Sequence, residues 1–282
     1  MNQELLRQVE IMFAALNQQS AAGSFPAPDA LSGLLSKHVD PSSPTTTIPA
    51  RPQILTYFAT AAVEMWLRSV HSFLISVSLT ESSPIWASVA GYYSSHYSVR
   101  AFAHLFGVFQ LHRKKRIVRL DKEQNSLVFR IEKKRHEREH TFYWKFVSEH
   151  PQLASDPLFY QNQEDQPASD GAHRNKANYS DHVDRFPVFQ PLDARYLWDR
   201  VDRISNIDMS AVQVPRADRF PDIDNVQIVA YYRLAKFRQL LDEALSGGNR
   251  FWKVQRNPSW CPDTMKFSVV EPVIAAPYAR NQ

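Results

Sequence analysis

Residues 86–109 constrain the fold more than any other segment, because they combine an apolar helix pattern with a row of polar, titratable side chains. At 3.6 residues per turn, Tyr92, His96, Arg100 and His104 follow a single i, i+4 ridge. Large apolar and aromatic residues cover the remaining helix surface: Val89, Tyr93, Phe102, Leu105, Phe106 and Phe109. Burying a polar row on such a helix costs free energy unless its groups form hydrogen bonds or ion pairs, or serve a function. The ridge is therefore the first candidate for a functional site.

The hydrophobic pattern as a whole predicts a mainly α-helical fold. Two long helices are expected at 54–79 and 86–109, and the short connection between them makes them antiparallel neighbours. The Ser83–Pro84 step suits the start of the second helix. Shorter helices are expected at 3–18, 30–37, 141–149, 193–204 and 223–245. We expect an antiparallel helical bundle with an irregular helical C-terminal half.

A small basic β-hairpin is expected to accompany the helices. Residues 116–120 and 127–131 alternate apolar with charged side chains around a polar turn, and the whole hairpin unit is placed at 113–138. Residues 40–52 are rich in Pro and Thr, which predicts an exposed connector. Three regions follow from these patterns: a helical bundle with the hairpin at 1–150, a polar loop or linker at 151–192, and a helical region at 193–282.

Composition narrows the class of protein. The single cysteine, Cys261, excludes an internal disulfide and a cysteine-based zinc cluster, which fits a reducing compartment. Neither a secretory signal nor a membrane-spanning segment is recognisable, so we expect a cytoplasmic protein with no membrane contact. Acidic loop residues lack compact metal-ligand spacing, and no glycine-rich nucleotide loop is present. We therefore expect no metal and no other cofactor.

Residues 112–140 have a marked local excess of positive charge. They hold eleven Lys or Arg against five Asp or Glu, a local excess of +6 compared with +4 for the whole chain. A hairpin with basic residues at both ends could lie along a phosphate backbone. The candidate nucleic-acid contacts are Arg113, Lys114, Lys115, Arg116, Lys133 and Lys134. The alternative is that these charges only discourage unwanted pairing at the strand edges.

Arg100 and His104 are the first candidate catalytic pair. A histidine can act as an acid or a base near neutral pH, while an arginine one helical turn away can bind a phosphate and stabilise its developing charge. The alternative is that both groups form hydrogen bonds within a helical core or at a dimer seam.

The aromatic run from Tyr92 to Leu105, with its Arg100–Ala101 step, resembles a helix of HEPN-type proteins. These are prokaryotic helical bundles of toxin and antiviral defence systems, and the resemblance covers about residues 54–109. Active members use an Arg and a His at a set spacing as a metal-independent RNase site, usually across a dimer. Arg100 and His104 are one residue too close for that spacing, whereas Arg135 and His140 have it. The resemblance thus implies a second candidate pair, with solvated charges as its alternative.

Two functions follow from these observations. The first is a HEPN-like component of a prokaryotic defence or toxin system, which binds RNA or another nucleic acid, acts with a protein partner or as a homodimer, and cleaves RNA without a metal. In that mechanism a histidine assists attack of the ribose 2′-hydroxyl on the adjacent phosphate, which an arginine holds. The alternative is a non-catalytic helical assembly subunit that binds a larger effector protein or itself.

Overall fold

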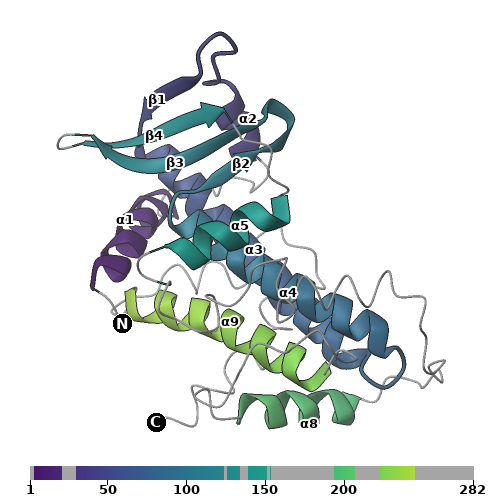
Figure 1. Ribbon diagram of the computed structural model, residues 1–282. Helices are drawn as coiled ribbons and strands as arrows, with labels where there is room; N and C mark the ends of the chain where they lie inside the picture. The colour runs from purple at the N-terminus through teal and green to yellow at the C-terminus, as the bar shows by residue number, and fades with distance from the viewer. Residues whose placement is uncertain are drawn as a thin grey trace.

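The computed structural model describes residues 3–20, 30–123, 126–133, 139–150, 153, 194–206 and 223–244. Its helices are α1 (Gln3–Ser20), α2 (Ala30–Ser36), α3 (Pro52–Ser78), α4 (Pro84–Leu105), α5 (Glu139–Glu149), α8 (Ala194–Ser205) and α9 (Ile223–Ala244). Its strands are β1 (Thr45–Pro49), β2 (Phe109–Leu111), β3 (Arg116–Glu123) and β4 (Ser126–Lys133). The described chain is mostly helical, as predicted, and the sheet lies at one end of the long helices (Figure 1).

The long helices α3 and α4 run antiparallel, as their short connection predicts. The Ser69 hydroxyl donates to the Ser94 carbonyl (2.7 Å), and the Ser76 hydroxyl donates to the Ala87 carbonyl (2.6 Å). A later residue of α3 thus pairs with an earlier residue of α4, which is the antiparallel arrangement. Small side chains at this contact let the two helices approach closely and carry their own hydrogen bonds in the buried interface.

Helix α9 packs on the same pair of helices. The indole nitrogen of Trp66 donates to the Leu234 carbonyl (2.9 Å), and the Trp66 and Phe237 rings stack with centroids 6.1 Å apart. Gly91 makes this approach possible, because a Cβ atom there would lie 2.7 Å from Cγ1 of Val226. Helix α9 therefore belongs to the same packed core as α3 and α4.

Helix α4 ends earlier than the sequence pattern predicts. Gly107 adopts a left-handed backbone conformation (φ +72°), and its N–H donates to the His104 carbonyl (2.9 Å). The N–H of Val108 donates to the Ala103 carbonyl (2.8 Å), which completes a Schellman-type cap. Phe109, expected to be the last helical residue, instead begins β2. This early end turns the chain into the sheet.

The sheet has the strand order β1-β4-β3-β2, with every neighbouring pair antiparallel. Strands β3 and β4 are the two that the sequence predicts, but the prediction of a connector at 40–52 is wrong at β1. Ile48 in β1 is buried opposite Phe129, and Phe129 stacks on Phe58 of α3 with ring centroids 4.8 Å apart. Burial of this apolar side chain draws the threonine-rich segment into the sheet.

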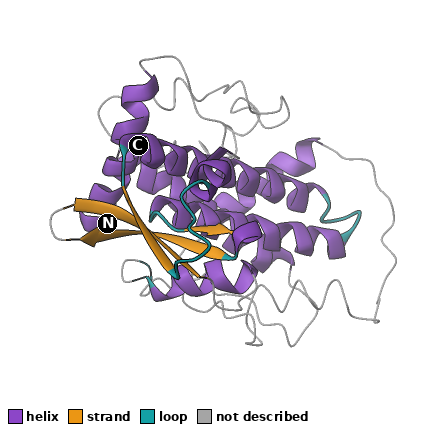
Figure 2. Ribbon diagram, turned by 90° about the horizontal axis from the view of Figure 1, so that it is seen from above, coloured by secondary structure: helices purple, strands orange, loops and turns teal. Residues whose placement is uncertain are grey.

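Several sequence predictions lie outside the described residues. They include nearly all of the polar loop or linker at 151–192, much of the helical region at 193–282, and Lys134 and Arg135. Helix α5 begins at Glu139, two residues before the start that the sequence pattern predicts. Within the described part of the chain, no helix is long and apolar enough to cross a membrane. Figure 2 shows the helices gathered beside the sheet.

Candidate functional site at the α4–α5 seam

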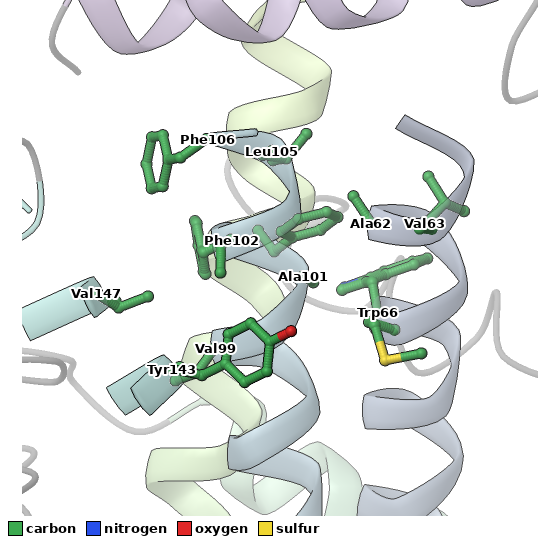
Figure 3. Packing of buried hydrophobic residues seen from close by; sticks show 14 of the residues in the cluster. Ala62, Val63, Trp66, Val99, Ala101, Phe102, Leu105, Phe106, Tyr143 and Val147 are labelled. Carbon is green, nitrogen blue, oxygen red and sulfur yellow. The ribbon is translucent and has the colours of Figure 1, made fainter. Parts of the chain in front are cut away.

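Helix α5 covers the polar ridge of α4 within the same chain. Tyr143 of α5 points toward α4 (Figure 3), and its ring centroid lies 5.9 Å from that of His104. One turn earlier on α5, the His140 ring lies 4.2 Å from the His96 ring, measured between centroids. We call this contact the α4–α5 seam; its polar members are Tyr92, His96, Arg100 and His104 of α4 with His140 and Tyr143 of α5.

The seam joins residues that the sequence assigns to two separate candidate pairs. Arg100 and His104 come from the first pair, and His140 comes from the second. His140 packs on His96, which precedes Arg100 by one helical turn on the α4 ridge. Arg135, the sequence partner of His140, lies outside the described residues. The described geometry therefore supports one combined site.

His104 is enclosed and is held by the backbone. Its side chain is only 1% exposed, and Nδ1 lies 2.9 Å from the Val108 carbonyl oxygen. A carbonyl can only accept, so Nδ1 carries the proton of this hydrogen bond. Burial, and secondly the Arg100 charge, lower the His104 pKa to about 3, although the Val108 carbonyl acts in the opposite direction. His104 is therefore neutral at pH 7 and ties the end of α4 to the chain leading into β2.

His140 is the more accessible histidine of the seam. Its Nδ1 atom lies 2.9 Å from the Tyr92 hydroxyl oxygen, and its side chain is half-buried, whereas Tyr92 is only 1% exposed. The ring is also bordered by His96 and Tyr93, the latter in an edge-on contact with centroids 6.1 Å apart. His140 thus combines a hydrogen-bonded ring with partial exposure of the residue, and a general acid or base must lie within hydrogen-bond reach of the proton that it moves.

Arg100 lies further along the seam and packs on an aromatic ring. Its guanidinium carbon is 5.2 Å from the centre of the Tyr143 ring, within the range of a cation–π contact. Tyr143 is itself fixed, since its hydroxyl accepts a hydrogen bond from the Gln110 backbone N–H of β2 (3.1 Å). Arg100 is half-buried, so its charge is oriented by the seam and partly open to solvent.

Four exposed basic residues gather at one end of the sheet. Arg113, Lys114 and Lys115 are exposed in the turn between β2 and β3. Lys133 is also exposed, and its register partner Arg116 directly follows that turn. We call Arg113, Lys114, Lys115 and Lys133 the basic end. Lys134 lies outside the described residues.

Arg116 has a different environment from the other predicted phosphate contacts. It is only 7% exposed, and its guanidinium donates to the carbonyls of Asp40, Ser43 and Pro44 at 3.2, 2.9 and 3.1 Å. These bonds secure the segment that enters β1. The side chain therefore holds the sheet together, and its donors are directed at backbone oxygens.

The opposite end of the hairpin carries charges of both signs. Arg119 lies opposite Arg130 in the register of β3 and β4. Arg130 forms ion pairs with Asp121 and Glu123, both at 3.1 Å. Exposed Arg119 and Lys122 continue the positive charge along β3, but the two acids make this end less basic than the basic end.

No group of three or more His, Cys, Asp or Glu residues in the described part of the chain could hold a metal ion. A cavity of about 230 Å³ lies beside α8 and is lined by Glu81, Asp199, Arg200 and Arg203, away from the seam.

Comparison with protein-family models, curated proteins and solved structures found no match. The function is therefore inferred from the chemistry of the described side chains.

Proposed function

We propose that this protein binds RNA and cleaves it without a metal, at the α4–α5 seam. His140 is the acid–base residue and Arg100 the phosphate-binding residue. The observation that supports this most is the position of His140, which bonds to Tyr92 and packs on the α4 ridge that also carries Arg100. The resemblance of residues 92–105 to HEPN-type proteins supports a role in a prokaryotic defence or toxin system, with a protein partner or a second copy of the chain.

The proposed reaction uses the ribose 2′-hydroxyl as the nucleophile. His140 takes the proton from that hydroxyl, and the oxygen forms a new bond to the adjacent phosphorus. The bond from phosphorus to the 5′-oxygen breaks, and the 5′-oxygen takes a proton from water. Arg100 stabilises the negative charge that builds on the phosphoryl oxygens. The products carry a 2′,3′-cyclic phosphate and a 5′-hydroxyl.

The basic end supplies the affinity for RNA in this proposal. The chain from Lys133 to His140 spans at most about 25 Å even if fully extended. Arg113 follows Gln110 by three residues, so their Cα atoms lie within about 11 Å of each other. The Gln110 backbone N–H is the group that donates to the Tyr143 hydroxyl of the seam. An RNA strand that contacts the basic end can therefore reach the seam. In this arrangement an antiparallel helical bundle orients the catalytic groups, and the basic hairpin contacts phosphates.

The enclosure of His104 favours a second candidate function. A buried, neutral histidine that binds a backbone carbonyl acts in folding and cannot donate a proton near pH 7. If His140 has the same kind of role, the protein is a non-catalytic helical subunit that assembles with a larger effector or with itself. The two functions make opposite predictions for RNA cleavage.

A cleavage assay separates the two functions. Purified protein is incubated with single-stranded RNA in EDTA, and His140→Ala is compared with the wild type. His71→Ala is the matched control, since His71 is a half-buried histidine of α3 outside the seam. The proposal expects cleavage by the wild type and the control and loss with His140→Ala. Equal cleavage by all three proteins would reject His140, and RNA binding without any cleavage would favour the assembly subunit.

A further inference from the structure

The solvent-accessible side of helix α4 carries a row of aromatic residues. We propose that this row stacks the bases of single-stranded RNA beside the seam, so that the protein binds bases as well as phosphates. The proposal deepens the proposed function and rests on it for RNA as the ligand. The stacking itself is tested by binding alone, without cleavage.

The accessible residues of α4 form one line along the helix. From Ala87 to Leu105 every residue is buried except Ala90, Tyr93, Tyr97 and Arg100. Trp86, which is 60% exposed, precedes them, and the steps of three or four residues place all five on one helix face. We call Trp86, Tyr93 and Tyr97 the aromatic stripe.

The composition of this face is unusual for the exposed side of a helix. The outer faces of surface helices typically carry charged and polar side chains. Helix α4 instead contains no Asp or Glu, and its outer face presents one indole and two phenol rings. Trp86 is the most exposed large apolar side chain in the described part of the chain. Such a face suits a ligand that has flat rings and negative charge, and nucleic acid has both.

The rings are spaced so that separate bases can use them. The Tyr93 and Tyr97 ring centroids lie 6.1 Å apart, with an angle of 32° between the ring planes. Trp86 lies seven residues before Tyr93, which is about 10 Å along the helix axis. Every base has a π-face, so stacking on these rings tolerates any RNA sequence. Bases of a duplex stack on one another, so the ligand is single-stranded.

The aromatic stripe leads to the α4–α5 seam. The Tyr93 ring meets the His140 ring edge-on with centroids 6.1 Å apart, and the Tyr97 ring lies 6.0 Å from the His96 ring. Arg100 follows Tyr97 by three residues, so it lies about one turn further along the same face. A base stacked on Tyr93 or Tyr97 therefore brings its ribose and phosphate beside the residues to which we assign the cleavage.

Binding of two uncleavable strands tests the stacking in the wild-type protein. The first probe is a single-stranded 2′-O-methyl RNA, which lacks the nucleophilic hydroxyl and stays intact. The second is an abasic strand of the same length and charge. By fluorescence anisotropy we expect the full-length protein to bind the strand with bases about 10-fold more tightly or better. Equal affinity for the two strands would overturn the proposal, and this comparison requires no variant to fold.

Leucine variants of the aromatic stripe locate the effect. Trp86→Leu and Tyr97→Leu remove a π-face but keep an apolar side chain, and circular dichroism checks that they fold. We expect each to weaken binding of the strand with bases by about 5- to 100-fold and to leave the salt slope and the affinity for the abasic strand unchanged. Ile75→Ala is the matched control, because Ile75 is 38% exposed and has no π-face. Losses no larger than that of Ile75→Ala would overturn the proposal.

Cleavage assays separate this proposal from the proposed function. Base-dependent binding through the aromatic stripe without cleavage of ordinary RNA would reject catalysis at the seam but keep the stripe as a binding site. Cleavage by a wild type that binds both probes equally would reject the stripe alone. If Trp86→Leu keeps its RNA affinity but loses self-association in analytical ultracentrifugation, the stripe is a protein contact and the proposal is overturned.

Discussion

The Tyr92 hydroxyl and Nδ1 of His140 lie 2.9 Å apart, although 48 residues separate them in the chain. This contact fixes the start of α5 against α4, about two helical turns before Arg100. It brings His140, from one candidate pair, to the helix that carries Arg100 and His104, the other pair. His104, one helical turn after Arg100, is an enclosed residue of the α4–α5 seam and is neutral at pH 7.

His104 should make the protein less stable as the pH falls. Burial, followed by Arg100, lowers its pKa from 6.5 to about 3 in the folded state, so the unfolded chain binds a proton between those values that the folded chain does not. The contribution of His104 to the free energy of unfolding is therefore complete above pH 6.5 and decreases at lower pH, by about 2 kcal/mol between pH 7 and pH 5.

Urea denaturation at pH 7 and pH 5 measures this effect. His104→Gln cannot titrate, so we expect its free energy of unfolding to fall by about 2 kcal/mol less over this interval than that of the wild type. His71→Gln serves as the control, because His71 lies outside the seam. If the His104→Gln and wild-type proteins lose the same stability, His104 is not the buried neutral group described here.

Gln110 should be replaceable by a leucine with a gain in stability. Its side chain is 6% exposed, and neither atom of its amide has a hydrogen-bond partner in the described structure. Because an unpaired buried amide is costly, we expect Gln110→Leu to raise the free energy of unfolding by about 1 kcal/mol. Gln110→Glu, which buries a charge at the same place, should lower it. Urea denaturation at pH 7 measures both, and a loss of stability in Gln110→Leu would show that the amide is used.

The basic end should account for the salt dependence of RNA binding. Replacing Arg113, Lys114 and Lys115 together by glutamine should weaken binding and reduce the slope of log affinity against log salt by about 0.7 for each lost phosphate contact on single-stranded RNA. Lys122→Gln is the control, since this exposed lysine lies near the opposite end of β3. Fluorescence anisotropy over a range of salt concentrations gives the slopes. An unchanged slope in the triple variant would remove the basic end from the RNA surface.

Hydrophobic periodicity located the helices because it records which face of a local segment is buried. The ranges expected for α3, α8 and α9 agree with the structure to within a few residues. Strand β1 was missed because the Thr-rich segment around Ile48 has no strong pattern of its own; its pairing with β4 supplies the structure. The end of α4 could have been predicted from Gly107, which offers a left-handed helix cap.

The arrangement of the candidate site can be predicted from the sequence only in part, for the same reason. The ridge that contains His96 and Arg100 follows from helical spacing alone. The contact of His140 with Tyr92 depends on how α5 packs on α4, which no local pattern records. Arg116 is a residue that the sequence misassigns. Its charge is visible in the sequence, but its burial against backbone carbonyls is not. Composition counts charges, and only tertiary structure shows which of them can reach a ligand.

The most direct test of the proposed function compares an RNA strand with DNA of the same sequence in the presence of EDTA. Because the 2′-hydroxyl is the nucleophile, the account predicts that wild-type protein binds both strands and cleaves only the RNA, leaving cyclic phosphate ends. RNA that stays intact while bound by the protein and its partners would contradict the account, as would equal cleavage of the DNA strand.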